Sequence, residues 1–411
     1  MLDNIDVQAL ASRIATPFYA YSAGAIRRRI TSLKSALEGL DATICFAVKA
    51  NSNLAILHLM AEAGLGADIV SAGELRRSLR AGIPASRIVF SGVGKSDDEI
   101  AEALAAGVWK FNVESSDELH ALQRLARERQ VIANAAVRIN PDVDAGTHDK
   151  ISTGKSENKF GVSIEEARRW FATANELSWV RLNGLHVHIG SQILNLDPYR
   201  TAFERVAAFW RELASAGHRI ESIDVGGGLG VRYREDQTPP ISPADYADVI
   251  REAFANFNGR IVLEPGRYLV AEAGVLLTRV IRVKQGKSRA FLIVDAAMND
   301  LLRPSLYDAW HDIAPVHAGS RPRVRYDVVG PVCETGDTFA IDREMPSCAP
   351  GDLLMITGAG AYGATMSSTY NSRPLLAEVL IDGQRYSIIR RRQTYEEMTA
   401  SEHVAQSWQT I

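Results

Sequence analysis

The sequence predicts an α/β fold: a (β/α)8 barrel of the TIM type joined to a second, mostly β domain. Three observations lead to this prediction. The chain has 411 residues, of which 46% are hydrophobic, so it can bury the cores of two domains. Short apolar segments alternate with amphipathic helical segments up to about residue 268. Beyond that point strand patterns dominate and long helical patterns are lacking.

The first elements are expected to be a helix, a strand and a second helix. Residues 5–16 read as a short amphipathic helix, and Pro17 then introduces an extended segment, FYAYS. Residues 24–40 carry apolar side chains at helical spacing, which predicts a longer amphipathic helix.

A repeating unit follows, made of a short apolar strand, a polar or glycine-rich turn and an amphipathic helix. The predicted strands cover residues 43–48, 67–70, 87–90, 109–113, 135–139, 184–189, 222–225 and 260–263. Helical patterns between them include residues 73–81, 96–106, 116–129, 164–175 and 198–216. Eight β-then-α units in succession favour a closed barrel. An open sheet of eight parallel strands is the alternative.

The region after residue 268 is expected to form the second domain. Its predicted strands cover residues 275–284, 290–294, 323–329, 353–356 and 376–381. The early FYAYS segment has no place in the barrel count, so we expect it to join this domain. The predicted domains are therefore residues 26–268 for the barrel, and residues 1–25 with 269–411 for the β-rich domain.

Composition excludes several classes of function. The net charge of −3 gives no bulk reason to expect nucleic acid or a membrane surface as a partner. The start of the chain lacks the basic and apolar regions of a signal peptide, and no apolar run is long enough to span a bilayer. Three cysteines are too few for a disulfide framework. These features predict a cytoplasmic protein.

Lys49 lies where the first apolar strand ends, within FAVKANSN at residues 46–53. An ammonium group at the end of a buried strand is costly to desolvate unless it has a partner or a chemical role. Taken alone, Lys49 is better explained without a chemical role, as a side chain whose aliphatic part packs against the protein while its amine reaches water. The other strand ends change this interpretation, because the carboxyl ends of barrel strands face one cavity.

These strand ends carry chemistry-bearing side chains. In order they are Lys49, Asp68 with Ser71, Ser91 with Gly92, Asn112 with Glu114, Arg138 with Asn140, His188, Gly226 to Gly228, and Glu264. GGGLG at residues 226–230 can converge backbone N–H groups on a phosphate, although glycine runs also make plain tight turns. EPGR at 264–267 could instead be a surface turn, and the histidine of HIGSQ at 188–192 could have a purely structural role. No grouping has the spacing of metal ligands, so no metal is expected.

Together, a lysine able to form an imine, a phosphate loop, an imidazole and a carboxylate describe a pyridoxal phosphate site. Glu264 at the pyridine nitrogen would keep that nitrogen protonated and make the ring a full electron sink. This favours decarboxylation, whereas an arginine at the same position would have favoured racemisation.

The motifs resemble those of the fold-type-III pyridoxal phosphate decarboxylases, whose barrel is similar to that of alanine racemase. The resemblance runs from TPFYAYS at residues 16–22 to YNSRP at 370–374. Its most specific motifs are FAVKANSN (46–53), DIVSAGEL (68–75), FNVES (111–115), ISTGKSENKFG (151–161), HIGSQ (188–192), GGGLG (226–230), EPGR (264–267), RPSLY (303–307), GPVCETGD (330–337) and GAYGA (360–364). So many motifs in order make an accidental match very improbable.

The resemblance implies a role for each site residue. It assigns Lys49 to the covalent link with the cofactor and His188 to the ring face. The implied cofactor-binding residues are Lys49, His188, Ser191, Gly226, Gly227, Gly228, Glu264, Pro265, Gly266, Arg267 and Tyr362. The implied substrate-binding residues are Arg267, Arg303, Tyr307, Glu334 and Tyr362. Cys333 would deliver a proton, and Cys333 with Glu334 would reach the site from a partner subunit, which implies a homodimer.

Composition alone would make Cys333 a small buried hydrophobe, Glu334 a surface charge and Tyr362 a core aromatic; the family pattern reverses these readings. Glu334 and the arginines then provide both signs of charge for the far end of a substrate. A diamino diacid satisfies both, whereas a simple diamine precursor would leave buried arginines unpaired. The expected reaction is decarboxylation of meso-2,6-diaminopimelate to L-lysine and carbon dioxide.

Three alternatives remain open at this point. One is a related decarboxylase acting on another basic amino acid or a polyamine precursor. Another is a protein that binds the cofactor without turnover. The last is an imine-forming aldolase that uses Lys49 without a cofactor.

Overall fold

A computed structural model describes residues 2–3, 5–144, 159–234, 236–317, 319–405 and 408. The chain forms two compact units. The barrel unit contains Ala23–Ala273 and Gly360–Thr365, and the β unit contains Leu2–Ser22, Gly274–Ala359 and Met366–Ile411. The short segment Gly360–Thr365 thus groups with the barrel, although the chain on both sides of it belongs to the β unit. The first eight residues of the ISTGKSENKFG motif lie outside the described residues.

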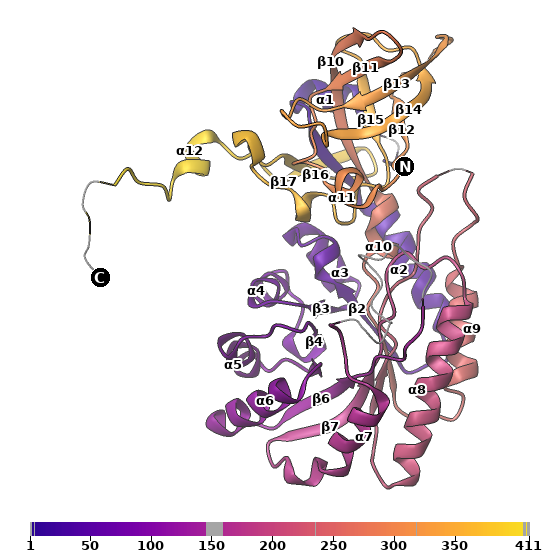
Figure 1. Cartoon of the computed structure of the whole chain (residues 1–411), viewed down its shortest axis with the longest axis vertical. Helices are drawn as coiled ribbons and strands as arrows, with labels where there is room; N and C mark the ends of the chain where they lie inside the picture. Colours follow the sequence, from indigo (N-terminus) through magenta and orange to yellow (C-terminus); the bar gives the residue numbers. More distant parts are fainter. Residues whose placement is uncertain are drawn as a thin grey trace. The chain divides into compact units, whose positions relative to one another are not determined.

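The barrel unit is a closed barrel of eight parallel strands in sequence order (Figure 1). The strands are β2 (Ala42–Ala47), β3 (Gly66–Ile69), β4 (Ile88–Phe90), β5 (Lys110–Val113), β6 (Ala133–Arg138), β7 (Val180–His186), β8 (Ser222–Asp224) and β9 (Arg260–Leu263). Pairing of β2 with both β3 and β9 closes the ring. The predicted barrel is therefore confirmed, and the open-sheet alternative is wrong.

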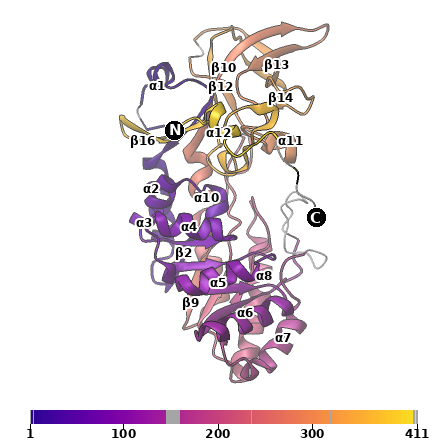
Figure 2. The same cartoon turned by 90° about the vertical axis from the view of Figure 1, so that its left-hand side faces the viewer.

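Helices surround this barrel (Figure 2). They are α2 (Ala23–Ala36), α3 (Leu54–Glu62), α4 (Ala72–Arg80), α5 (Asp97–Ala106), α6 (Ser116–Arg129), α7 (Ile164–Ala172), α8 (Asp197–Ser215), α9 (Pro243–Ala253) and α10 (Arg267–Val270). Several begin at a serine whose hydroxyl accepts a hydrogen bond from the third residue of the helix: Ser71, Ser96, Ser115, Ser163 and Ser242. Such caps satisfy N–H groups that the helix leaves unpaired. They also fix where each strand-end loop stops.

The interior of the barrel holds apolar side chains and buried polar contacts, among them the bond from Lys110 to Ser222. Cys45, Val89 and Val262 from separate strands form a buried cluster with Trp109. Asn112 on β5 contacts Asp224 on β8, and these strands are not neighbours in the barrel. Because strand side chains alternate between the two faces of a sheet, such contacts show which positions point inward.

The β unit is a sheet in the order β14-β13-β11-β10-β1-β16-β17, with β15 on β10 and β12 on β15. Its strands are β1 (Phe18–Ser22), β10 (Gly274–Gln285), β11 (Ala290–Val294), β12 (Ile313–Pro315), β13 (Arg323–Val329), β14 (Thr338–Pro346), β15 (Leu353–Ile356), β16 (Ala377–Asp382) and β17 (Arg385–Arg390). The FYAYS strand β1 lies between β10 and β16. The sequence analysis did not predict β12, β14 or β17.

Short helices complete the described structure. They include α1 (Val7–Arg13), α11 (Arg303–Tyr307), α12 (Tyr395–Thr399) and the 3-10 turn η1 (Val48–Ala50) that follows β2. Residues of α1 pack on the sheet of the β unit, in a core that includes Leu10, Phe18, Val275 and Val379. Within the described part of the chain, none of the helices has the length and apolar character needed to cross a membrane.

Candidate active site

Lys49 lies in η1, directly after β2, at the carboxyl end of the barrel. Its Nζ donates to Oδ2 of Asp68, on β3, at 2.7 Å. The side chain of Asp68 is fully buried, whereas that of Lys49 is 40% exposed. Burial by itself lowers the pKa of Lys49, but Asp68, Tyr362 and Glu264 outweigh burial and raise it. The amine of Lys49 is therefore a protonated ammonium group, which pairs with the buried Asp68 carboxylate and is itself partly exposed.

His188 follows β7 and accepts a hydrogen bond at Nδ1 from the N–H of Gly227, at 3.2 Å. Its other ring nitrogen, Nε2, therefore carries the proton when the ring is neutral. Burial and the positive charges of Arg138 and Lys49 lower the pKa of His188 to about 3. At neutral pH this imidazole is uncharged, as suits a flat surface for packing against an aromatic ring.

The glycine-rich loop after β8 requires glycine for two physical reasons. Gly226 and Gly228 have φ of +70° and +103°, in the left-handed region that L residues rarely adopt. A Cβ on Gly227 would lie 2.3 Å from the carbonyl oxygen of Glu264, so this loop packs directly on the next strand end. Larger residues would therefore displace the loop from the barrel mouth, which is the opening at the carboxyl ends of the barrel strands.

Glu264 follows β9, and its carboxylate accepts three hydrogen bonds inside the barrel. Ser91 Oγ and Asn112 Nδ2 donate to Oε1 at 3.2 and 3.1 Å, and His186 Nε2 donates to Oε2 at 3.3 Å. Burial would raise the pKa of Glu264, but His186 and Lys49 outweigh burial and lower it. Glu264 is therefore an ionised carboxylate in a buried position.

Asp224 lies beside Glu264, but its pKa is shifted in the opposite direction. Burial and the nearby charge of Glu264 raise the pKa of Asp224 well above its usual range. Its Oδ1 accepts from the N–H of Gly226 at 2.9 Å. Asp224 thus links the buried carboxylate of Glu264 to the glycine-rich loop.

Arg267, at the start of α10, is buried and connects three parts of the mouth. Its Nη2 donates to Ser191 Oγ at 3.0 Å and its Nη1 donates to the Tyr233 hydroxyl at 2.7 Å. The guanidinium also lies over the ring of Tyr362, 4.9 Å from its centroid. The backbone N–H of Tyr362 donates to the carbonyl of Ala50, next to Lys49, at 2.8 Å. The predicted residues Lys49, Ser191, Arg267 and Tyr362 are therefore brought together.

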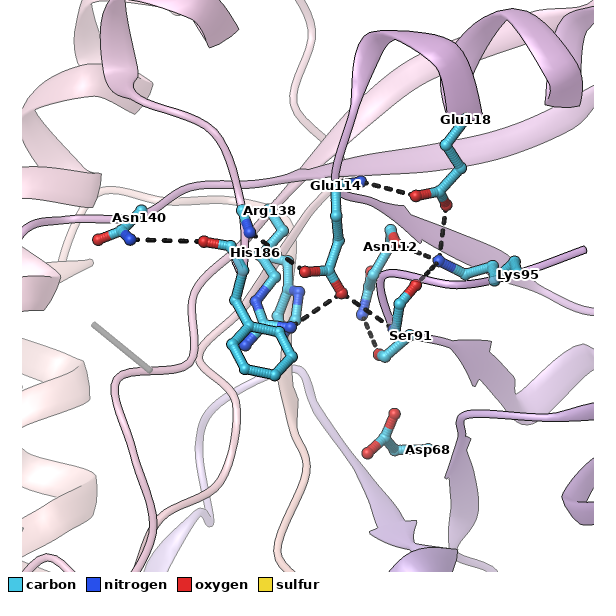
Figure 3. Close-up of polar contacts among 12 residues, drawn as sticks. Asp68, Ser91, Lys95, Asn112, Glu114, Glu118, Arg138, Asn140 and His186 are labelled. Carbon is cyan, nitrogen blue, oxygen red and sulfur yellow. Dashed lines mark hydrogen bonds and ion pairs between the residues drawn. The ribbon is translucent and has the colours of Figure 1, made fainter. Parts of the chain in front are cut away.

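A buried ionic network lies at the carboxyl ends of β4, β5 and β6 (Figure 3). Glu114, at the end of β5, pairs with Arg138 on β6 at 2.8 Å and accepts from the N–H groups of Gly92 and Gly161. A neighbouring pair joins Lys95 to Glu118 at 2.6 Å, with the lysine side chain only 1% exposed. These pairs fix the loops after β4, β5 and β6 relative to one another.

The other predicted site residues form a second group within the β unit. Arg303 and Tyr307 lie on α11, and Ser305 Oγ donates to the carbonyl of Gly336 at 2.6 Å. That bond ties α11 to the turn that carries Cys333 and Glu334. Cys333 is exposed, and Glu334, also exposed, accepts from the Tyr370 hydroxyl at 2.9 Å.

Known proteins resemble the chain over nearly its full length. The family model described as "Pyridoxal-dependent decarboxylase, pyridoxal binding domain" matches residues 23–271. A diaminopimelate decarboxylase of Pseudomonas aeruginosa is 49% identical over 400 residues, which cover 97% of this chain and 96% of that protein. The chain belongs to the diaminopimelate decarboxylase family. The family predicted from the sequence motifs is thus confirmed.

Further members of the diaminopimelate decarboxylase family show the same similarity. The protein of Zymomonas mobilis is 47% identical over 404 residues, covering 98% of this chain and 96% of that protein. The crystal structure of diaminopimelate decarboxylase from Helicobacter pylori complexed with L-lysine matches with a TM-score of 0.93. That comparison has 43% identity and covers 97% of this chain and 99% of the other.

Pyridoxal phosphate is the cofactor of this decarboxylase family, and the barrel mouth fits it chemically. It offers an amine at Lys49, a neutral imidazole at His188 and an ionised buried carboxylate at Glu264. Gly226, Gly227 and Gly228 have no side chains, so this loop leaves room for a phosphate group to approach the backbone. Oδ1 of Asp68 and Nδ1 of His186 are buried without a hydrogen-bond partner among the described residues. These two atoms could therefore form hydrogen bonds with a bound group.

Sequence analysis missed His186, Asp224 and Tyr233 as members of this site. His186 and Asp224 each precede a predicted site residue, His188 and Gly226, by two positions. Because strand side chains alternate between faces, a polar residue at that spacing also points into the barrel. This spacing is a usable signal, whereas Tyr233 lies in a loop and the sequence offers none.

Proposed function

We propose that this pyridoxal-dependent decarboxylase converts meso-2,6-diaminopimelate to L-lysine and carbon dioxide. The observation that carries the proposal is the buried, ionised Glu264 in a barrel mouth that also holds Lys49 and His188. The relatives that share nearly the whole chain support the substrate, since they are diaminopimelate decarboxylases. The match to a structure complexed with L-lysine supports the product.

Within this proposal, the barrel residues 26–268 hold the cofactor together with Tyr362. When bound, pyridoxal phosphate stabilises the electron pair that remains on the α-carbon after carbon dioxide leaves. Lys49 forms the covalent attachment, and Glu264 keeps the pyridine nitrogen protonated. His188 packs against the ring face, and its neutral state avoids placing a second cation beside the ring. The phosphate is assigned to Ser191, Gly228, the backbone of Glu264, Pro265, Gly266 and Arg267, and the hydroxyl of Tyr362. Gly226 and Gly227 shape the loop beside it, since their N–H groups donate to Asp224 and His188.

Recognition of the far end of the substrate is assigned to charged side chains of both signs. Arg267, Arg303 and Tyr307 bind the carboxylate, and Glu334 binds the ammonium group. A guanidinium matches a carboxylate in two parallel hydrogen bonds, which gives orientation as well as attraction. A substrate with only a cation at this end would leave the buried Arg303 without that partner.

The proposal also includes a cytoplasmic homodimer with shared sites. Cys333 and Glu334 are exposed in the single chain, although the predicted chemistry requires both of them beside a substrate. Delivery of this turn, residues 330–337, to the barrel mouth of a second copy would meet that requirement. Cys333 then supplies the proton that replaces the departed carboxylate.

The decisive experiment is a product analysis of the purified protein with added pyridoxal phosphate. We expect equimolar lysine and carbon dioxide from meso-diaminopimelate, and much slower turnover of lysine, ornithine and arginine. The Glu334→Gln variant should lose this preference, while Lys49→Ala should lose the visible absorbance of the bound cofactor. Faster turnover of ornithine or lysine by the unaltered enzyme would replace the proposal with its alternative, a decarboxylase of basic amino acids.

A further inference from the structure

Arg303 is held inside the β unit by a histidine that the sequence analysis did not identify. Its Nη1 lies 2.8 Å from Nε2 of His311, and Nδ1 of the same ring lies 2.7 Å from the carbonyl oxygen of Thr357. His311 is fully buried and Arg303 is 6% exposed. The imidazole therefore connects the predicted carboxylate-binding arginine to the end of strand β15.

The two partners of His311 determine where its proton resides. A carbonyl oxygen can only accept, so Nδ1 must carry the hydrogen that it donates to Thr357. A guanidinium can only donate, so Nε2 must present its lone pair to Arg303. His311 is thus a neutral imidazole with one fixed tautomer, and it accepts one N–H of Arg303.

The backbone around His311 is fixed as well. The N–H of Thr357 donates to the carbonyl of Asp312 at 2.9 Å, and Arg343 Nη1 donates to the carbonyl of His311 at 3.0 Å. Arg343 in turn lies over the ring of Trp310. The backbone that carries His311, the acceptor for Arg303, is therefore held by contacts at residues 310, 311 and 312.

We propose that His311 is a positioning residue that sets the orientation of the Arg303 guanidinium for the far carboxylate of the substrate. The inference rests on the proposed function, since it assigns Arg303 to that carboxylate. A guanidinium binds a carboxylate through two parallel bonds, so a rotation of its plane weakens recognition even though the charge remains. His311 does not touch the reacting atoms and acts only through Arg303.

A pair of variants separates positioning from packing. In His311→Gln the amide oxygen can replace Nε2 as the acceptor for Arg303, whereas in His311→Asn the shorter amide can replace only the Nδ1 donor to Thr357. We expect His311→Asn to raise KM for meso-diaminopimelate and the inhibition constant of L-lysine by about tenfold or more, because a hydrogen bond to a charged group is lost. Its kcat should change by less than about threefold. His311→Gln should stay within about threefold of the unaltered enzyme in all three quantities.

A ligand without carboxylates provides the control. Inhibition by 1,5-diaminopentane should be equal in all three proteins, because it has no carboxylate for Arg303 to bind. Equal losses in the Gln and Asn variants, or a loss of 1,5-diaminopentane binding that parallels the loss of lysine binding, would show a merely structural role. The unaltered enzyme tests the proposed function separately, because failure to use diaminopimelate appears there before any variant is made.

A measurement on the unaltered protein keeps the inference testable if a variant does not fold. Nitrogen-15 NMR of histidine-labelled protein distinguishes a protonated from an unprotonated ring nitrogen. The His311 resonances should show a proton on Nδ1 and none on Nε2 at neutral pH. A proton on Nε2 would overturn the inference, since that nitrogen could not then accept from Arg303.

Discussion

Glu114 offers the sharpest test of the electrostatics around the barrel mouth. Its Oε1 accepts from Arg138 at 2.8 Å and from the Gly92 N–H at 3.0 Å, and its Oε2 accepts from the Gly161 N–H at 3.1 Å. The two charged side chains are 1% and 6% exposed. Alanine at position 114 would leave a buried guanidinium without its counter-charge and two N–H groups without an acceptor.

The expected loss of stability follows from these contacts. Breaking a buried ion pair by removing one partner costs about 3–5 kcal/mol, because the other charge remains buried. A barrel of this size loses about 2–4 °C in Tm for each kcal/mol, so Glu114→Ala should melt about 6–20 °C lower. Glu114→Gln keeps one oxygen acceptor, which can serve Arg138 and Gly92, but it loses the charge and leaves the Gly161 N–H without an acceptor. A smaller loss than for alanine, about 1–3 kcal/mol, is therefore expected.

The pH dependence of this contribution has a definite sign. Burial would raise the pKa of Glu114, but Arg138 and Lys95 outweigh burial and lower it below its ordinary value of 4.5. A carboxyl group whose pKa is lower in the folded protein stabilises it above that ordinary value and loses this effect as the pH falls through the lowered value. The unaltered protein should therefore lose more stability in acid than Glu114→Gln.

Thermal melting of the cofactor-free protein and both variants, followed by circular dichroism from pH 3 to 8, gives the required data. Measuring the cofactor-free protein separates stability from any change in cofactor affinity. A Tm for Glu114→Ala within about 2 °C of the unaltered protein would refute the reasoning, as would equal losses in the two variants.

Two further predictions concern the cofactor site. Glu264→Gln should lower kcat by about a hundredfold or more, because an amide cannot hold the pyridine nitrogen protonated; a kcat within about threefold of the unaltered enzyme would contradict the role of Glu264. Burial raises the pKa of Glu74, beside the Lys49–Asp68 pair, to about 7. Because this value exceeds that of the unfolded chain, Glu74 contributes stability that is full below about pH 4.5 and lost as pH rises through about 7. The Tm of Glu74→Gln relative to the unaltered protein should thus rise over this interval, and parallel curves would show that Glu74 does not titrate there.

The barrel could be predicted from the sequence because its strands contain short apolar runs that are followed by polar strand ends. Buried parallel strands are apolar on both faces, so Ile88–Phe90 and Arg260–Leu263 stand out between amphipathic helices. Strand β17 has mainly exposed residues and β14 alternates buried with charged positions irregularly. Both strands depend on pairing with neighbours that lie far away in the sequence, which no local pattern shows.

The candidate site shows the same division between local and non-local information. Lys49, His188 and Glu264 end apolar strands, so their exposure to one mouth follows from the barrel itself. The opposite pKa shifts of Glu264 and Asp224 depend on which side chains meet across the interior. The role of His311 depends on a contact with Thr357, 46 positions further along the chain. Such contacts require three-dimensional coordinates.

The affiliation of Gly360–Thr365 with the barrel has a consequence for dissecting the gene. A fragment ending at Ala273 would contain every barrel strand and still lack Tyr362, whose ring lies against Arg267 and whose N–H caps the Ala50 carbonyl. No single cut in the coding sequence can therefore yield an intact cofactor-binding module. Shuffling or splitting experiments on this protein would have to graft that six-residue segment back by a linker or supply it in trans.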